Sequence, residues 1–489
     1  MLSTMKFRFL LTALLFVLIS ETPSNASVSA SVSVNAASPL GVLQPQAFGV
    51  NTAVWDGHLL DSSVPSLLQQ AGVTFLRYPG GSTSDVYHWQ TNSATAGTGQ
   101  YINPNDTFDN FMSVVNALGG TAVITVNYGS NAAGTGGGDP AEAAAWVQYA
   151  NVTKGYGVKY WEIGNEIYGN GEYGADWEED LHADHSPAAY ANNGLQFISQ
   201  MKAVDPTIKV GVVLCAPGNW PDGVSPDWNS NVLSICGQQI DFVIVHWYPQ
   251  GPGSESDSYL LGCTNQVAGM VSRLKSLINQ YCGANASNVQ ILLTENNSVY
   301  SDPGKQSVSQ VNALYLADDF MTWLENGATS AIWWDLHNGI TLGNASSSLF
   351  GSTKYGDYGI LSSGECSGSI CEPAANTPFR PYYGLKMLSY LGRPGDQMVS
   401  TTSSTGLIAA HAVKQANGRL ALLLINKDRS NSYTVTVTLS GYTPASKSAA
   451  MYTYSKTGSS IAAATRTGIS TKFNVAVGPY SLRTLVLGP

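Results

Sequence analysis

Two glutamates, each at the end of a short apolar run, are the residues whose types and setting could do chemistry together. Residues 161–166 read Trp-Glu-Ile-Gly-Asn-Glu and end on Glu166, and residues 292–296 read Leu-Leu-Thr-Glu-Asn around Glu295. A facing pair of carboxyl groups is the minimal equipment for hydrolysing a glycosidic bond. The two runs lie far apart in the sequence, so a fold that gathers strand ends is needed to bring them together.

Residues 41–394 predict such a fold, because short runs rich in Val and Ile alternate there with polar loops and helix-like segments. This alternation is typical of βα units in the α/β class, and eight candidate strands predict a (β/α)8 TIM barrel. The candidates are Ala47–Asn51, Phe75–Pro79, Ala122–Tyr128, Tyr160–Gly164, Val210–Cys215, Phe242–Trp247, Gln290–Thr294 and Ala331–Asp335. A doubly wound open sheet is the alternative fold, but no Gly-rich phosphate loop follows the first candidate strand. Because the active site of such a barrel lies at the carboxyl ends of its strands, Glu166 and Glu295 would share one rim, from strands four and seven.

The pattern changes after Pro394, where short strand candidates alternate with turn residues. They predict a β-sandwich domain over residues 395–489. Its strand candidates are Leu407–Val413, Leu420–Ile425, Tyr433–Leu439, Ala450–Tyr454, Phe473–Val477 and Leu482–Leu487. Residues 27–40 begin with Ser alternating with Val or Ala, which predicts a further strand. That strand has no place in a barrel over residues 41–394, so we expect it to join the sandwich.

Residues 1–26 have the pattern of a secretory signal peptide. Lys6 and Arg8 precede an apolar run over residues 9–19, and small residues follow at 24–26. The apolar run is too short to span a bilayer. The mature chain would therefore begin just after these residues and be secreted or periplasmic, without a membrane partner.

The chain contains six cysteines, which suit an oxidising compartment outside the cytoplasm. Proximity in the sequence suggests three disulfides, namely Cys215–Cys236, Cys263–Cys282 and Cys366–Cys371. Six cysteines allow many connectivities, so this pairing is a hypothesis. The cysteines and histidines lack the spacing of a zinc site, and no metal is expected.

The composition excludes some classes of protein and favours others. A hydrophobic content of 44% and a charged content of 11% are typical of a well-buried globular protein. The formal net charge of −10 argues against a nucleic-acid partner, because phosphates are bound by clustered Lys and Arg. Aromatic residues make up 10% of the chain and suit either a large core or the binding of sugar rings. We expect an oligo- or polysaccharide partner and no cofactor, and interpret the acidic stretch Trp177–Asp180 as a solvated loop.

Short stretches at four of the predicted strand ends resemble signatures of glycoside hydrolase family 51. They are Arg77–Gly81 with Asp85–Trp89 on strand two, Trp161–Gly171 on strand four, His246–Tyr248 on strand six and Thr294–Glu295 on strand seven. The order of a barrel followed by a β-sandwich also matches. The resemblance extends to clan A, the wider clan of retaining barrel glycosidases, in which families 39, 30 and 79 share much of this plan.

The resemblance implies unequal roles for the two glutamates. Glu166 would be the general acid/base and Glu295 the nucleophile of a retaining mechanism. Arg77 would lie beneath Glu295 and lower its pKa, while an apolar or carboxylate-facing setting would raise the pKa of Glu166. A retaining enzyme places its two carboxyl groups about 5–5.5 Å apart, whereas a separation of about 6.5–9.5 Å indicates inversion.

The resemblance also implies which residues surround the sugar. Asn165 would hydrogen-bond the hydroxyl next to the reacting carbon. Tyr248 would hydrogen-bond the nucleophile, and His246 would help to order the acid/base side of the site. The other substrate-binding candidates stand at further strand ends and are Arg77, Asn127, Asn51 and Trp334.

Two positions depart from the family pattern. Asn51 stands where the family usually carries a Glu that binds the arabinose ring, and Asn296 stands where a Trp commonly follows the nucleophile. We predict a secreted retaining glycosidase of plant-type polysaccharides, with α-L-arabinofuranosidase as the first expectation. β-Xylosidase, β-glucuronidase and endo-glucanase of the same clan are alternatives. A non-catalytic carbohydrate-binding protein is the alternative from another class.

Overall fold

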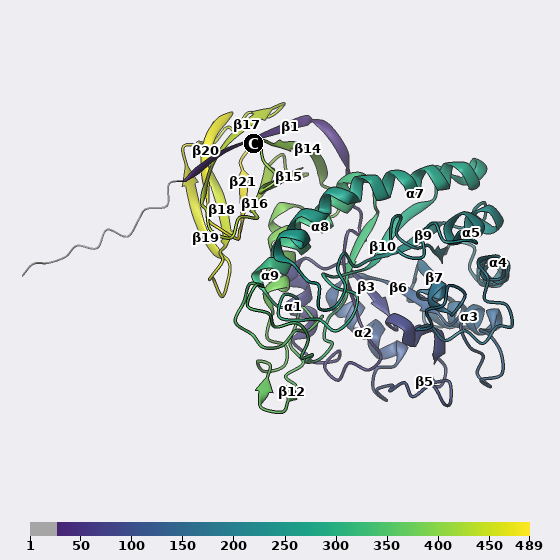
Figure 1. Ribbon diagram of the computed structural model, residues 1–489. Helices are drawn as coiled ribbons and strands as arrows, with labels where there is room; N and C mark the ends of the chain where they lie inside the picture. The colour runs from purple at the N-terminus through teal and green to yellow at the C-terminus, as the bar shows by residue number, and fades with distance from the viewer. Residues whose placement is uncertain (1–26) are drawn as a thin grey trace, which may run out of the picture.

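The computed structural model describes residues 27–489, which form a barrel and a second, β-stranded domain (Figure 1). The barrel closes with eight parallel strands, because each pairs with the next along the chain and the last pairs with the first. The strands are β2 (Phe48–Asn51), β3 (Phe75–Tyr78), β6 (Thr121–Val126), β7 (Tyr160–Ile163), β8 (Lys209–Val213), β9 (Phe242–Trp247), β10 (Gln290–Asn296) and β11 (Ser330–Trp333). The predicted TIM barrel is confirmed. The predicted signal peptide lies outside the described residues.

The barrel strands carry unbroken apolar sequences because both of their faces are covered. All six residues of β9, which reads Phe-Val-Ile-Val-His-Trp, are buried. Helices outside the barrel and side chains within it impose this pattern on parallel strands. The pairing of β10 with β9 shifts between Leu293 and Glu295. An irregularity of this kind re-aims side chains, and here it lies directly at Glu295.

Helices form the outer layer of the barrel. They are α1 (Val64–Ala71), α2 (Phe108–Leu118), α3 (Pro140–Val147), α4 (Pro187–Val204), α5 (Trp228–Cys236), α6 (Asp257–Gly262), α7 (Val267–Tyr281), α8 (Gln310–Asn326) and α9 (Arg380–Leu391). The side chains of Asp139 and Ser186 cap α3 and α4, which then open on a proline. Proline fits there because its missing N–H would have no partner in the first turn. Within residues 27–489, every helix is too short or too polar to cross a membrane.

The second domain is a curled sheet of nine strands around its own core. In spatial order they are β19 (Ala462–Thr467), β18 (Ser448–Tyr454), β21 (Ser481–Leu487), β16 (Leu420–Asn426), β15 (Ile408–Lys414), β14 (Gln397–Ser403), β1 (Val28–Val42), β17 (Tyr433–Ser440) and β20 (Lys472–Val477). Figure 1 shows the purple β1 among the green and yellow C-terminal strands. It pairs antiparallel with β14 and parallel with β17. The predicted C-terminal β-domain with an N-terminal strand is confirmed.

Helices α8 and α9 connect the two domains. α9 packs on β16, β18 and β21, and α8 packs on β1 and β15. Asp318 of α8 accepts hydrogen bonds from His411 Nε2 at 3.0 Å and from Lys427 Nζ at 2.7 Å. His411 Nδ1 lies 3.0 Å from Oε1 of Glu325, also on α8. We call Asp318, Glu325, His411 and Lys427 the domain-junction network.

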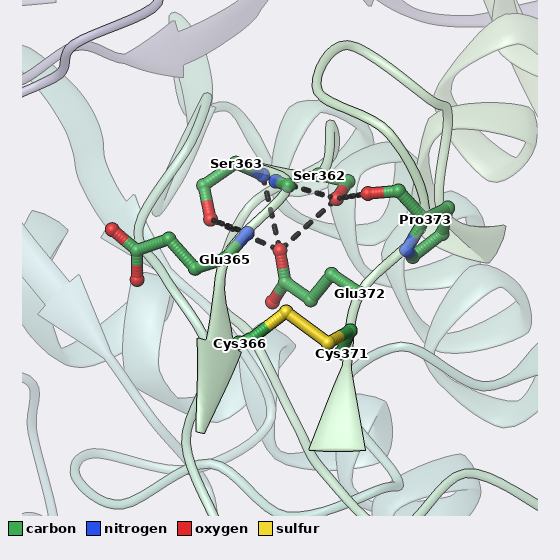
Figure 2. The surroundings of a disulfide bond; sticks show 8 residues. Ser362, Ser363, Glu365, Cys366, Cys371, Glu372 and Pro373 are labelled. Atoms are coloured by element: carbon green, nitrogen blue, oxygen red, sulfur yellow. Dashed lines mark hydrogen bonds between the residues drawn. A yellow bond between two sulfur atoms is a disulfide. The ribbon is translucent and has the colours of Figure 1, made fainter. Parts of the chain in front are cut away.

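A single disulfide forms within residues 27–489, between Cys366 and Cys371. It closes the hairpin of β12 (Cys366–Ser367) and β13 (Ile370–Cys371). Figure 2 shows the adjacent Glu372, whose Oε2 accepts from Ser362 Oγ at 3.0 Å and from Ser363 N at 3.1 Å. The short hairpin and its flanking segment are therefore fixed by a covalent bond and a buried carboxyl group together.

The hypothesised disulfides Cys215–Cys236 and Cys263–Cys282 are wrong, because all four of these cysteines are buried free thiols. The thiol of Cys215 lies against the side chain of Asn229, whereas that of Cys236 lies against a backbone oxygen within its own helix. Proximity in the sequence failed as a guide because neighbours in the chain are not neighbours in the fold, and Cys282 lies beside Gly237, the residue after Cys236.

Candidate active site

A cavity of about 980 Å³ opens at the carboxyl ends of the barrel strands. Glu166 reaches it from the loop after β7 and Glu295 from the end of β10. One carboxylate oxygen of each lies within 4.8 Å of the other. Much of the wall is aromatic and consists of Trp55, Tyr168, Trp177, Trp220, Tyr248, Tyr300, Trp334 and Tyr358. A cavity of this size and lining suits sugar rings beside a pair of carboxyl groups.

Arg77 of β3 is completely buried and ties four polar side chains together. Its Nη1 donates to Glu295 Oε1 and its Nε to Glu162 Oε2, each at 2.6 Å. The guanidinium also donates to Asn51 Oδ1 at 3.0 Å and to Asn165 Oδ1 at 2.8 Å. Burial would lower the pKa of Arg77, but the charges of Glu162 and Glu295 raise it above its ordinary value. Arg77 is thus a fixed cation beneath Glu295.

The second oxygen of Glu295 is held from strand six of the barrel. Tyr248 OH donates to Oε2 at 2.7 Å, and His246 Nδ1 lies 3.5 Å from the same oxygen. Burial raises the pKa of Tyr248 well above its ordinary value, and the charge of Glu295 raises it further. The phenol therefore keeps its proton and acts as a donor, so that both oxygens of Glu295 are oriented by protein groups.

Three donors converge on Glu166. Its Oε1 lies 2.9 Å from His246 Nδ1 and accepts from Tyr168 OH at 2.8 Å, and its Oε2 accepts from Trp177 Nε1 at 3.0 Å. Burial would raise the pKa of Glu166, but these hydrogen bonds and the charge of His246 lower it below its ordinary value. The expected rise in this pKa is therefore wrong for the unliganded protein, because the carboxylate faces donors rather than an apolar wall.

His246 links the two glutamates through both of its ring nitrogens. Nδ1 faces Glu166, while Nε2 lies 3.0 Å from the hydroxyl of Thr294, the residue before Glu295. A proton on Nδ1 would be shared with Glu166, since the two atoms are within hydrogen-bonding distance. The geometry thus makes Glu166 and His246 a pair that can hold one proton between them.

Glu166, His246 and Glu295 also offer one possible metal-ligand atom each, all within 4.8 Å of one another. However, every carboxylate oxygen of the two glutamates already faces a protein donor, from Arg77, Tyr248, Tyr168, His246 or Trp177. Donors arranged in this way stabilise free carboxylates. The donor set therefore fits an acid–base pair better than a metal centre.

The local backbone explains why a glycine begins the Gly-Asn-Glu sequence after β7. Gly164 has a φ of 73°, and a Cβ at this position would lie 2.7 Å from the side chain of Ile167. Glycine is favoured there because it adopts left-handed conformations without steric cost. The turn directs Asn165 and Glu166 to the cavity, which both of them line.

The predicted substrate-binding residues divide into two groups. Asn165, His246, Tyr248 and Trp334 line the cavity, whereas Arg77, Asn51 and Asn127 lie behind it. The amide nitrogen of Asn51 donates to the backbone oxygens of Thr294 and Trp333. Its amide oxygen accepts from Arg77, so Asn51 supports the floor of the site instead of reaching a sugar. Asn127 is occupied by a local hydrogen bond, in which its Oδ1 accepts from Ser130 N at 3.0 Å.

The position after Glu295 is also directed away from the cavity. Asn296 is completely buried, accepts from Tyr315 OH at 3.0 Å and donates to Asp319. Neighbouring residues of a strand point to opposite faces. The departure from the family pattern at Asn296 therefore alters the outer packing of β10 and leaves the cavity wall to other side chains.

The interpretation of Trp177–Asp180 as a solvated loop holds only in part, because Trp177 and Glu179 are exposed whereas Glu178 and Asp180 are buried. Glu178 is 2% and Asp180 8% exposed, and Trp177 contacts Glu166. Glu162, a charged residue within an apolar strand run, is also absent from the predicted site residues. Such a residue needs a buried partner, which here is Arg77. That signal was available in the sequence for Glu162, whereas the burial of Glu178 depends on how its loop folds back.

Known proteins match this chain at the levels of family and sequence. The model of the glycosyl hydrolase family 79 N-terminal domain matches residues 101–319, which include Glu166 and Glu295. A probable α-L-arabinofuranosidase C of Aspergillus clavatus is 27% identical over 194 residues, covering 35% of this chain and 34% of that protein. The chain thus spans about a third of the length of the curated relatives it matches.

Solved structures match nearly the whole chain. An α-L-arabinofuranosidase from Thermotoga maritima, in complex with arabinose, is 18% identical with a TM-score of 0.71, covering 94% of this chain and 100% of its own. CelM2, a bifunctional glucanase-xylanase from a metagenome library, is 17% identical with a TM-score of 0.68, covering 94% of this chain and 99% of its own. At these identities the likeness shows the fold. Together, the family model, the relatives and the fold show that the chain resembles the clan A glycoside hydrolases.

Proposed function

We propose that the chain is a retaining glycoside hydrolase that cleaves neutral oligo- or polysaccharides in two displacement steps. The observation that carries this proposal is the pair of Glu166 and Glu295, whose nearest paired oxygens lie within 4.8 Å across the cavity. This spacing suits the separation of about 5–5.5 Å in retaining enzymes better than the separation of about 6.5–9.5 Å in inverting ones. The salt bridge from Arg77 supports Glu295 as the nucleophile.

In the first step, an oxygen of Glu295 attacks the anomeric carbon and the bond from that carbon to the leaving oxygen breaks. Glu166 gives a proton to the leaving oxygen, which departs as an alcohol. In the second step, water attacks the same carbon, Glu166 accepts a proton from that water, and the carboxylate of Glu295 is released. His246 Nδ1 lies 2.9 Å from Glu166 Oε1, so a proton held between these two groups can serve the first step.

The lining of the cavity supports a neutral sugar as substrate. Among the described residues that line it, none is Lys or Arg, and the polar contacts include the amides of Gln100, Asn219 and Gln250. A β-glucuronidase needs groups that compensate for the negative charge of the sugar carboxylate. β-Glucuronidase stays an alternative, because amide groups can also bind that carboxylate and the matched family model is that of family 79.

For the finer activity, we propose α-L-arabinofuranosidase, on the basis of the relatives and the fold. A second candidate is an endo-acting glucanase or xylanase, and the shape of the cavity favours it. The volume of about 980 Å³ is at the upper end for pockets that hold small ligands, so it exceeds the need of one sugar. Trp177 and Trp220 lie with ring centroids 5.4 Å apart on the side of Glu166, where the leaving sugar would bind.

We also propose that the protein is exported from the cytoplasm. The signal-peptide pattern in residues 1–26 supports export, and so does the disulfide Cys366–Cys371.

The proposal is tested with purified protein on nitrophenyl glycosides and on polymeric arabinan, xylan and glucan. We expect turnover of at least one of them, with the product's first-formed anomer matching the substrate's configuration by NMR. A 2-deoxy-2-fluoro glycoside of the preferred sugar should become attached to the peptide that contains Glu295. An inverted first product contradicts the retaining mechanism, and sugar binding without any turnover supports the non-catalytic alternative.

A further inference from the structure

We propose that Glu178 is a positioning residue, whose carboxyl group donates a hydrogen bond to Asp85 and thereby fixes the direction of Asn165 in the cavity. This inference rests on the proposed glycosidase function, because Asn165 lines the cavity beside the two glutamates. It concerns a residue that lies behind the cavity wall and does not touch the sugar.

The loop that carries Glu178 folds back tightly on its own start. The backbone N–H groups of Trp177 and Glu178 both donate to the oxygen of Gly169, at 2.9 and 3.1 Å. A Cβ on Gly169 would lie 2.3 Å from the indole of Trp177, so only glycine leaves room for this return. As a consequence, the side chains of Trp177 and Glu178 form hydrogen bonds with different residues. Trp177 donates to Glu166, and Glu178 lies beside Asn165.

The carboxyl group of Glu178 has one satisfied oxygen and one without a partner. Oε1 accepts from Ser82 Oγ and from Asn165 Nδ2, each at 2.8 Å. Oε2 is buried and faces no donor. The neighbouring carboxylate of Asp85 accepts from the backbone N–H groups of Tyr128 at 3.1 Å and Asn165 at 2.8 Å. A proton on Glu178 Oε2 that points to Asp85 would satisfy the unpartnered oxygen, because buried polar atoms are costly without a partner.

The charges around this pair agree with a shared proton. Burial raises the pKa of Glu178 well above its ordinary value, and the charges of Asp85 and Glu166 raise it further. Burial also raises the pKa of Asp85, to about 7, and Asp180 adds to this rise. Asp180 itself is paired with His182 at 2.7 Å. Two carboxyl groups in such a setting cannot both ionise at neutral pH, so one proton remains between them.

The direction of Asn165 follows from its two partners. The guanidinium of Arg77 can only donate, so it binds Oδ1 of Asn165, at 2.8 Å. Oε1 of Glu178 can accept, so it binds the Nδ2 group. The second hydrogen of that group then remains for a sugar hydroxyl. Without Glu178, the amide would keep only the contact with Arg77 and lose its fixed direction.

Three variants test this role in the assay that turns over the preferred substrate. Glu178→Met keeps the length but loses the hydrogen bonds, and we expect kcat to fall about 10- to 100-fold with little change in KM. The fall would appear in kcat because hydrogen bonds near the reacting carbon strengthen in the transition state. Glu178→Gln can donate to Asp85 and accept from Asn165, so it should restore most of the loss. The exposed neighbour provides the control, Glu179→Gln, which should match the wild type.

A second measurement does not depend on activity. In the wild type, the raised pKa of Glu178 means that the folded protein holds a proton there that the unfolded chain releases above a pH of about 4.5. The free energy of unfolding therefore falls as the pH rises from the pKa of Glu178 in the unfolded chain toward its raised pKa in the folded protein. Glu178→Gln should make this fall less steep, whereas Glu179→Gln should leave it unchanged.

The two measurements separate the possible failures. If the free energy of unfolding of Glu178→Gln falls with pH as steeply as that of the wild type, Glu178 does not hold the proton and the inference is overturned. A loss of kcat in Glu178→Gln as large as in Glu178→Met also overturns it, since the hydrogen bonds would then not be the cause. If the protein hydrolyses no glycoside, the proposed function fails, while the stability slope still decides where the proton lies.

Discussion

Two buried networks of charged side chains in this protein use similar residues but differ in their balance. In the domain-junction network, His411 and Lys427 face Asp318 and Glu325, so cationic and acidic groups are equal in number. In the floor of the cavity, the single cation Arg77 faces both Glu162 and Glu295, and Glu166 lies nearby with His246. In the domain-junction network the cationic and acidic groups balance. We call it the matched network, and we call the cavity network, which has an excess of acidic groups, the unmatched network.

The matched network holds all of its charges in place. Burial would raise the pKa of Asp318, but Lys427 and His411 lower it far below its ordinary value. Burial would lower the pKa of His411, but Glu325 and Asp318 raise it to about 10. Near neutral pH neither Asp318 nor His411 is therefore close to releasing or gaining a proton. Such a network is suited to joining the two domains.

The unmatched network has to retain protons. Glu166 and His246 in the cavity are placed to hold one between them. Glu178 and Asp85, which join this network through Asn165, are placed to hold another. A proton that two groups share can be given to a substrate and taken back. The comparison teaches that the balance of charge, more than burial itself, distinguishes the domain-junction network from the network proposed to be catalytic.

The largest expected effect comes from breaking the cavity network at Glu295, its proposed nucleophile. Glu295→Gln should lower kcat by about 10⁴-fold or more, because an amide oxygen cannot form the glycosyl-enzyme. Steady-state kinetics on the preferred substrate measure this loss. Glu325→Gln, a change at the domain junction, is the matched control and should keep activity. Activity of Glu295→Gln within tenfold of the wild type would refute the assigned nucleophile.

A smaller effect, on stability alone, is expected at the domain junction. Asp318→Asn leaves His411 and Lys427 buried with one acid fewer, which should destabilise the protein by about 3–5 kcal/mol. Urea denaturation measures the change, and kcat at 25 °C should stay close to that of the wild type. A loss below about 1 kcal/mol would show that the junction network is not the matched unit that its geometry indicates.

The smallest expected effect is on the pH dependence of stability. His411 has a folded pKa of about 10 and an unfolded pKa of about 6.5, so its contribution is complete below pH 6.5 and is lost as the pH rises toward 10. The loss is spread over this whole pH range, so the change between neighbouring pH values is small. His411→Gln should flatten the corresponding part of the profile. If the free energy of unfolding of His411→Gln changes with pH as steeply as that of the wild type, the titrating group at the junction is not His411.

The sequence predicted the barrel well because buried parallel strands and their helices leave a strong local pattern. It missed β14 and β19, since Gln397–Ser403 and Ala462–Thr467 contain few large apolar side chains and β19 lies at the edge of its sheet. In the site, Glu166 and Glu295 were found from their places at strand ends. Trp177 and Glu178 were missed because nothing local shows that their loop returns to Gly169.

The sequence by itself determined the barrel, the N-terminal strand of the second domain and the pair of glutamates, because periodicity and strand ends are local properties of a chain. Only the tertiary structure decided that Glu166 has a lowered pKa, that Glu178 is buried and that four of the cysteines are free. These properties depend on hydrogen bonds, charges and desolvation from residues far away in the sequence. A carboxyl group acquires its protonation state from such neighbours, and folding alone selects them.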